Sequence, residues 1–414
     1  MNSIKLLTFG WEYAPIVTGG LGVVCRDLSK SLAAQGVDVS FVLPKLPKQV
    51  SVDYLDIINA SEIEITEQTV KHIQVDTLLT PYASYDVYNK QLTALKKRLD
   101  LSEDAGSLYG YDLFNEIERY AARAYDIAKE VDPDVIHAHD WMTFKAGINA
   151  KRATGKPLIT HIHATEYDRS GGNPYMEIVN YERMGMVYAD RVFAVSEKTK
   201  NTIVEQYMIP EDKITVIHNA VPYNGERAST VVPADKKEKI VLFLGRMSVQ
   251  KGADYLLKAA EKVLKIHKDV KFVFVGAGDM LKYLIDMSID LGISQNVVFT
   301  GYMSHEEVDK AYHYADLFVM PSVSEPFGIT SLEAIRNGTP VLMSKQSGAS
   351  EVVSNALKVD FWDTEEMANK ILAVLMHESL AETLIDNGYS DLERLSWDKQ
   401  AKKVIDIYKE LIQK

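Results

Sequence analysis

Two glutamates with seven residues between them bracket a segment whose residue types suggest ligand binding. It reads Glu325-Pro-Phe-Gly-Ile-Thr-Ser-Leu-Glu333, so a glycine-containing turn separates the first carboxylate from an expected helix that carries the second. Glu333 could hold a ribose through its vicinal hydroxyls, and Glu325 could reach a sugar. The N–H groups of residues 328–331 could receive a phosphate, because helix starts carry unpaired donors and a partial positive charge. The alternative is an acidic loop before an ordinary amphipathic helix, since this spacing is common.

A basic loop in the same half of the chain offers complementary charge. Gly245-Arg-Met-Ser-Val-Gln-Lys251 follows an expected strand and leads into a helix. Arg246 and Lys251 could neutralise a diphosphate leaving group as its bond to a sugar breaks. A solvated basic loop is the alternative. We favour the functional interpretation because the loop follows the carboxyl end of a strand, where binding residues concentrate.

Histidines close two neighbouring strands in the first half of the chain. His137-Ala-His139-Asp140 ends one expected strand, and His161-Ile-His163 ends the next. Alternate residues of a strand share a face, so the two pairs could form a metal cluster. Zinc sites usually recruit histidine together with cysteine or carboxylates at recognisable spacing. We therefore expect no metal, and expect instead one histidine per strand end to point into a cleft as a sugar-binding group.

Two glycine pairs follow other expected strands. Gly19-Gly20 precedes the first helix, where glycines let the backbone approach a ligand and the helix start favours anions. Gly276-Ala-Gly278 could lie beside a nucleotide base, although it lacks the full dinucleotide fingerprint. Tight turns explain both pairs equally well.

Alternating apolar runs and helical patterns position these residues. In the first half the expected strands are 5–9, 37–43, 72–78, 134–137, 157–162, 191–195 and 214–217, and the expected helices are 21–35, 113–130, 144–153, 175–188 and 197–207. In the second half the expected strands are 240–244, 270–275, 297–300, 317–320 and 340–343, and the expected helices are 253–266, 280–291, 305–314, 331–337, 364–377 and 398–412. This alternation predicts mostly parallel sheets with right-handed crossovers.

A polar stretch at 222–239 contains two prolines and no apolar period, so it is interpreted as a connection between domains. The fold class is therefore α/β, with two doubly wound domains in tandem. Ligands of such sheets lie beyond the carboxyl ends of the strands. Two domains that face each other create a cleft with two walls, which suits a reaction between a donor and an acceptor.

Composition limits the classes of function. A chain of 414 residues is too long for one typical core, and its net charge of −12 argues against a general nucleic-acid binder. Cys25 is the single cysteine, so an intrachain disulfide is excluded and a cysteine-based zinc site is disfavoured.

The sequence predicts a cytoplasmic protein without membrane insertion. The first apolar run is too short for a signal peptide, and no apolar stretch approaches the roughly 20 residues that span a bilayer. Residues 89–99 form a basic amphipathic stretch, which we interpret as a solvated helix face in preference to a membrane contact.

Together these motifs resemble those of two-domain retaining glycosyltransferases of family 4, which have the GT-B fold. The resemblance is to the glycogen/starch synthase and sucrose-phosphate synthase type. The matching segments are 19–21, 137–141, 160–166, 245–246 with Lys251, 315–322, 325–333 and 338–341. The resemblance implies two Rossmann-like domains that face a central cleft. Residues 1–222 would form the acceptor-side domain and 223–394 the nucleotide-sugar domain, with a last helix in 395–414 that crosses back to the first.

The resemblance also implies roles for individual residues. Arg246 and Lys251 would hold the donor diphosphate and stabilise it as it departs, and Glu325 would contact the donor sugar. His163 and Asp140 would lie beside that sugar on the wall of the first domain. The remaining donor contacts are implied at Glu333 on the ribose and at Gly19, Gly20, Gly245, Gly276, Tyr302, Phe327, Gly328, Ile329 and Thr330.

The implied reaction is a front-face substitution in which the leaving phosphate helps to deprotonate the acceptor, without a metal or other cofactor. We expect a hexose, glucose first, to pass from ADP-glucose or UDP-glucose to a carbohydrate acceptor, with an α-glucan as the leading candidate. One departure matters, because Val17 stands where the best-known synthases carry lysine. A small or lipid-linked acceptor therefore stays open, and a nucleotide-sugar epimerase and a non-catalytic sugar-binding protein are remoter alternatives. The oligomeric state is left open.

Overall fold

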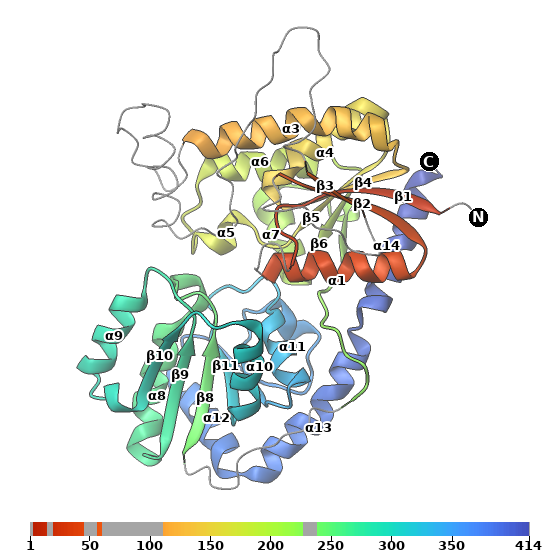
Figure 1. Cartoon of the computed structure of the whole chain (residues 1–414). Helices are drawn as coiled ribbons and strands as arrows, with labels where there is room; N and C mark the ends of the chain where they lie inside the picture. The colour runs from red at the N-terminus through yellow and green to blue at the C-terminus, as the bar shows by residue number, and fades with distance from the viewer. Residues whose placement is uncertain (1–2, 15–19, 45–55, 60–110, 227–237, 414) are drawn as a thin grey trace.

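The protein folds into two α/β lobes, each built on one parallel sheet with helices on both faces (Figure 1). The computed structural model describes residues 3–14, 20–44, 56–59, 111–226 and 238–413. Gly19, Val17, the expected strand 72–78 and the basic stretch 89–99 lie outside the described residues.

The first sheet has seven strands in the order β3-β2-β1-β4-β5-β6-β7, and all of its pairings are parallel. The strands are β1 (Ile4–Phe9), β2 (Val37–Leu43), β3 (Asp56–Asn59), β4 (Val135–His139), β5 (Leu158–Ile162), β6 (Arg191–Ala194) and β7 (Ile214–Val216). The helices are α1 (Gly20–Ala34), α3 (Tyr111–Val131), α4 (Trp141–Thr154), α5 (Glu166–Arg169), α6 (Met176–Tyr188) and α7 (Glu197–Tyr207).

The second sheet has six strands in the order β10-β9-β8-β11-β12-β13, again all parallel. The strands are β8 (Lys239–Leu244), β9 (Val270–Val275), β10 (Val297–Gly301), β11 (Leu317–Met320), β12 (Val341–Ser344) and β13 (Leu357–Val359). The helices are α8 (Ala253–Ile266), α9 (Leu281–Asp290), α10 (His305–Tyr314), α11 (Ile329–Arg336), α12 (Thr364–Met376), α13 (Glu378–Arg394) and α14 (Trp397–Ile412). The prediction of an α/β fold with parallel sheets is confirmed.

Both faces of each sheet are buried, which explains the nearly continuous apolar runs in the strands. In the first sheet one face packs against α3, α4, α6 and α7, and the other packs against α1 and α14. The last helix thus returns to the first sheet (Figure 1), where Tyr408 is fully buried and the Ser31 Oγ donates to Asp398 Oδ1 at 2.7 Å.

Two strands and two α-helices of the described residues were not expected from the sequence: β3, β13, α5 and α13. The largest is α13, whose buried residues are Gly388, Tyr389, Asp391 and Leu392. Partly buried residues such as Leu384 continue this face at helical spacing, so the helix has a regular apolar stripe that packs against α11 and α12.

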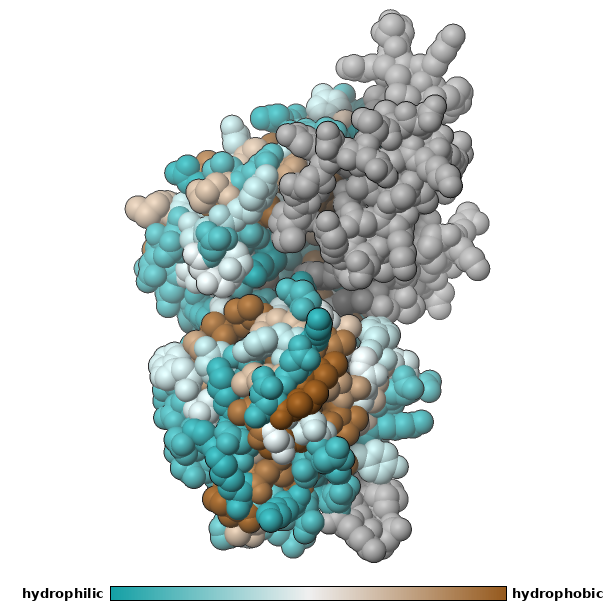
Figure 2. All heavy atoms as spheres, turned by 90° about the vertical axis from the view of Figure 1, so that its left-hand side faces the viewer, coloured by the Kyte–Doolittle hydropathy of each residue, from teal (hydrophilic) through white to brown (hydrophobic). Residues whose placement is uncertain are grey.

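On the face of the molecule drawn in Figure 2, the described residues are mostly polar. Figure 2 shows apolar side chains gathered in a stripe on the second lobe, on the side that carries α9. Exposed residues of that helix include Ile285 and Ile289. Among the described helices, none combines the length and the hydropathy that crossing a bilayer requires.

The strand order of both sheets defines where a ligand would bind. In the first sheet the order reverses between β1 and β4, and in the second between β8 and β11. Ligands of doubly wound sheets bind beyond the carboxyl ends of the strands at such reversals. The loops that follow these four strands contain Glu12, Asp140, the 245–251 segment and Glu325, which defines the candidate site.

Candidate active site

Glu325 lies in the loop after β11 and forms an ion pair with Lys251 from the loop after β8. The Lys251 Nζ is 2.6 Å from Glu325 Oε2, and the Ser322 hydroxyl donates to the same oxygen at 3.0 Å. Glu325 is only 7% exposed, and its backbone is held by bonds to Gln346 and Gly348. The pair therefore has a fixed position at the edge of the second sheet.

Gly328 turns the chain from this loop into α11. Its φ is 103°, and a Cβ there would lie 2.7 Å from the Met320 Cε and 3.1 Å from the Glu325 Cγ. Only glycine fits both the conformation and the space. The turn places the first amides of α11, at Ile329 and Thr330, beside Glu325, and the first amides of a helix have no intrahelical acceptor. This end of α11 is therefore suited to receive an anion.

Glu333 lies one turn into α11 and is partly buried. The hydroxyl of Tyr312 in α10 donates to Glu333 Oε2 at 3.3 Å and to the Thr330 carbonyl at 3.1 Å. Burial raises the pKa of Glu333, against the opposing effects of Arg336 and the Tyr312 hydrogen bond. The tyrosine orients the carboxyl group, which is the arrangement needed to bind a diol.

Backbone contacts between two loops shape the rest of the second wall. The Gly245 N–H donates to the Val275 carbonyl at 3.0 Å, and a Cβ on Gly276 would lie 2.1 Å from the Gly245 carbonyl oxygen. Arg246 follows and is exposed. Tyr302, beyond the end of β10, is 75% exposed. A planar ligand group could lie along these close-packed loops.

Asp140 ends β4 on the opposite wall and has a strained backbone. Its φ of 60° and ψ of 165° are rare for a residue with a side chain, and such conformations cost about 1–3 kcal/mol. The strain directs its Oδ1 to the backbone N–H of His163, at 2.8 Å. Burial raises the pKa of Asp140 to about 6, although Arg169 and the backbone N–H groups of His163 and Ala164 oppose this shift.

His163 follows β5 and is partly buried. Its Nε2 lies 2.9 Å from the Nδ1 of His139. Burial lowers the pKa of His163 to about 3, so the imidazole is neutral at physiological pH. Asp140 holds the backbone of His163 and His139 holds its ring, so the ring has its Nδ1 left for a single hydrogen bond.

Glu12, after β1, was assigned no role among the expected site residues. It is 1% exposed, and the Gly22 N–H donates to its Oε2 at 3.1 Å. Burial and the charge of Asp140 raise its pKa to about 7, while the Gly22 hydrogen bond and the charge of Arg246 lower it. The effect of Arg246 shows that the loop of the second lobe lies near the first wall. A carboxylate placed just after the first strand was the available signal.

Comparisons with known proteins match both halves of the chain. Residues 5–213 match the family model described as starch synthase catalytic domain, and residues 226–391 match glycosyl transferases group 1. An uncharacterised glycosyltransferase of Methanocaldococcus jannaschii is 31% identical over 98% of both chains. The chain belongs to the starch synthase family of glycosyltransferases.

Two further similar proteins agree with this assignment. Glycogen synthase of Mycobacterium tuberculosis is 28% identical to this chain. The match covers 85% of this chain and 80% of the glycogen synthase. Sucrose-phosphate synthase of Thermosynechococcus elongatus has the same GT-B fold, with a TM-score of 0.75, 20% identity and 99% of each chain covered. The resemblance inferred from the motifs is confirmed at the level of family and fold.

The two lobes of the glycosyltransferase touch through a polar cluster beside Glu325. Ser324 Oγ donates to Asp168 Oδ1 at 2.7 Å, and Lys198 Nζ lies 2.9 Å from both groups. The Ser196 hydroxyl donates to the Pro326 carbonyl at 2.6 Å, and Ile329 packs against the core of the first lobe. Sequence reasoning did not find this cluster, because its members are separated by long stretches of chain and share no motif.

The structure thus places the expected residues of the glycosyltransferase on two walls. Asp140, His163 and Gly20 lie on the first. Lys251, Arg246, Glu325, Glu333, Gly245, Gly276, Tyr302, Phe327, Gly328, Ile329 and Thr330 lie on the second. Phe327 is buried and contacts the ring of His218, so its side chain supports the loop, and only its backbone remains for a ligand.

Proposed function

We propose that this glycosyltransferase moves a hexose, with glucose as the first candidate, from a nucleoside-diphosphate sugar to a carbohydrate hydroxyl with retention of configuration. The ion pair of Lys251 and Glu325 beside the start of α11 is the observation that carries the proposal. It sets a cation, a carboxylate and helix amides around one point. A departing diphosphate and the sugar that it leaves need these three groups together.

Arg246 and Lys251 would bind the diphosphate with the amides of Ile329 and Thr330. Charge that develops on the leaving oxygen is stabilised most by donors already oriented before the reaction. Lys251 is oriented by Glu325, and the amides are oriented by the turn at Gly328. These groups supply the charge stabilisation that Mg²⁺ supplies in other enzymes, so the proposed transfer needs no metal.

Glu333 would bind the ribose, because its carboxyl group is oriented by Tyr312 toward the start of α11. The base would then extend toward Gly276 and Tyr302. The side chain of Tyr302 is exposed and could stack on any base, so both adenine and uracil fit this part of the proposal. ADP-glucose and UDP-glucose are the two donors to compare.

His163 and Asp140 would position the sugar from the first wall. In the proposed step the bond between the anomeric carbon and the diphosphate oxygen breaks, and the acceptor oxygen bonds to the same face of that carbon. The acceptor proton passes to a phosphate oxygen, so no residue forms a covalent intermediate. The polar cluster of Ser324, Asp168 and Lys198 would hold the lobes together and exclude water.

An α-glucan is the first candidate for the acceptor. The starch synthase model and the likeness to a glycogen synthase support this choice. Val17, where the best-known synthases carry lysine, supports a small or lipid-linked acceptor as the second candidate. We also propose that the enzyme acts in the cytoplasm.

A donor screen tests the proposal. Hydrolysis of ADP-, UDP- and GDP-hexoses is measured alone and then with glycogen, maltooligosaccharides or fructose 6-phosphate. We expect one donor to be used and one acceptor to stimulate its consumption, with retained configuration in the product. Conversion of a nucleotide sugar into its epimer without release of nucleoside diphosphate would contradict the proposal.

A further inference from the structure

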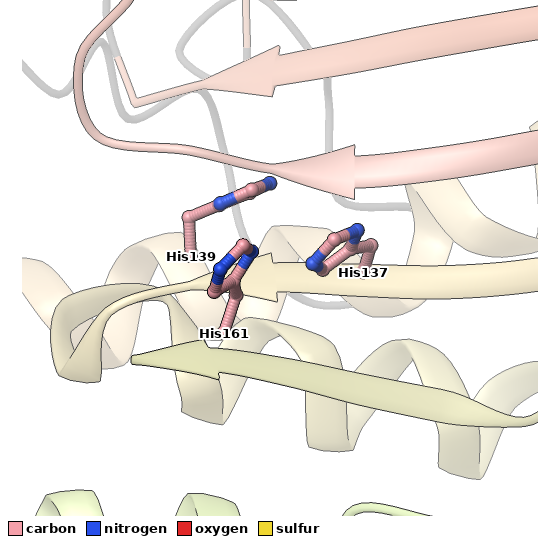
Figure 3. A group of neighbouring side chains, drawn as sticks. All are labelled: His137, His139 and His161. Carbon is pink, nitrogen blue, oxygen red and sulfur yellow. The ribbon is translucent and has the colours of Figure 1, made fainter. Parts of the chain in front are cut away.

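Four histidine rings lie together on one face of the first sheet. The parallel register of β4 and β5 places His139 directly beside His161, and His137 precedes His139 by two residues on the same face. His137, His139 and His161 are each no more than 2% exposed. Figure 3 shows their three rings gathered at the ends of the two strands. The ring of His163 stacks on that of His161, with centroids 4.2 Å apart.

Several nitrogens of this cluster are without a partner. Within the described ranges, His137 Nε2 and both nitrogens of His161 make no hydrogen bond. Thr8, which lies beside His137 in β1, also has an unpartnered hydroxyl. A buried polar group without a partner costs about 1–3 kcal/mol, so a cluster of them indicates an occupant.

The spacing of these nitrogens matches a small cation. One ring nitrogen from each of His137, His139 and His161 lies within 4.8 Å of the other two. Zinc binds imidazole at about 2.0–2.1 Å in a tetrahedron, which sets ligand nitrogens roughly 3.4 Å apart. The three rings are nearly parallel, with interplanar angles of 11°, 24° and 33°, so they would have to turn about their Cβ–Cγ bonds to direct these nitrogens at one ion. Three histidines with an open fourth position form a known type of zinc set.

We propose that His137, His139 and His161 bind one divalent transition-metal ion, with zinc as the first candidate. The ion would take Nε2 of His137 and His139, because their Nδ1 atoms are already engaged. His137 Nδ1 lies 2.7 Å from the Tyr408 hydroxyl, and His139 Nδ1 lies 2.9 Å from His163 Nε2. Metal-binding histidines usually have the second nitrogen held by such a partner, which fixes the orientation of the ring.

The ion would have a structural role and no part in the bond exchange. It would fix the rings of His137, His139 and His161 at the ends of β4 and β5. It would also connect β4 to α14, because Tyr408 belongs to that helix. The site itself does not depend on the proposed function, since only the histidines and Tyr408 form it.

Metal titration of the full-length protein tests this inference. The protein is stripped with a chelator, titrated with Co²⁺ or Zn²⁺ and passed through gel filtration. We expect about one retained ion per chain, and a visible Co²⁺ spectrum of the intensity typical of four-coordinate sites. Retention of less than about a tenth of an ion per chain would overturn the proposal, since it would mean that water alone fills the cluster.

Two variants identify the ligands. Within the described residues, the side chain of His161 makes no hydrogen bond, so the His161→Leu variant should keep the fold. Its affinity for Co²⁺ should fall by more than about 100-fold. Tyr408→Phe keeps all three ligands but loses the partner of His137, and loss of such a partner weakens binding by about 10- to 100-fold. His313→Leu, in α10 of the second lobe, is the matched control and should bind as the unmodified protein does.

Unchanged affinity in His161→Leu would refute the ligand assignment. If that variant does not fold, Tyr408→Phe decides, and binding as tight as that of the unmodified protein would refute it. Both variants are judged by metal content and by Co²⁺ spectra, so the test does not depend on an assay of sugar transfer.

Discussion

Lys251 and Glu325 are 74 positions apart in the chain, and their charged groups meet at 2.6 Å. Two loops at the strand-order reversal of the second sheet bring them together. Each side chain limits the rotamers of the other, so the cation is oriented before any ligand arrives. Stabilisation that is organised in advance acts most strongly on a transition state.

Lys251→Ala should lower kcat by about 10²–10³-fold, since a donor aimed at the leaving oxygen acts mainly in the transition state. Steady-state kinetics with the identified donor would measure this. Lys258→Ala, which removes a more exposed lysine of α8, is the control and should retain normal turnover. An unchanged kcat with a raised KM would show that Lys251 binds the donor without assisting its departure.

Glu333→Gln should raise KM for the donor by about tenfold and change kcat much less. A ribose contact is made equally in the ground state and the transition state, and such contacts affect binding alone. Donor titrations of the variant and of Glu306→Gln, an exposed position in α10, would be compared. A fall in kcat without a change in KM would place Glu333 at the reacting centre.

Glu12 should make stability depend on pH in a defined direction. Its pKa in the folded protein is about 7, against an ordinary value of 4.5, so the folded state holds a proton that the unfolded state releases between these values. The contribution to stability is full below about pH 4.5 and is lost as the pH rises to about 7. At about 1.4 kcal/mol for each pH unit, the loss reaches about 3 kcal/mol at most.

Glu12→Gln carries no such proton and provides the comparison. Thermal midpoints of both proteins would be measured at several values between pH 4.5 and 8. Relative to the variant, the unmodified protein should lose stability up to about pH 7 and then stay level. A constant difference between the two proteins across this range would show that Glu12 is ionised as easily in the fold as in the unfolded chain.

Chelation should leave the turnover of the glycosyltransferase intact, because Arg246 and Lys251 provide the positive charge at the proposed leaving group. If the histidine cluster holds an ion, the same treatment should lower the thermal midpoint, since an ion bound only to the folded state stabilises it. Activity and thermal unfolding would be measured before and after EDTA, and again with Zn²⁺ added. A loss of activity that Zn²⁺ restores would assign the ion a part in the transfer.

Much of the fold could be predicted from local pattern. Strand–helix alternation, with strands placed within a few residues, followed from apolar periodicity because parallel strands are buried on both faces. The expected strand at 134–137 was too short, since β4 continues to His139. We had placed the end of this strand at the histidines because they are polar. In the structure, their side chains are buried on one face of the sheet. The apolar stripe of α13 also has helical spacing, but the helix was not predicted from the sequence.

The sequence by itself determined the fold class, the family and the types of residues that face the proposed donor, because these depend on local periodicity and on motifs in a fixed order. Only the tertiary structure decided which of those residues meet. The pairing of Lys251 with Glu325, the polar cluster between the lobes and the row of histidines across β4 and β5 all depend on strand order and register. These are set by the packing of distant segments around a common core, and no local pattern encodes them.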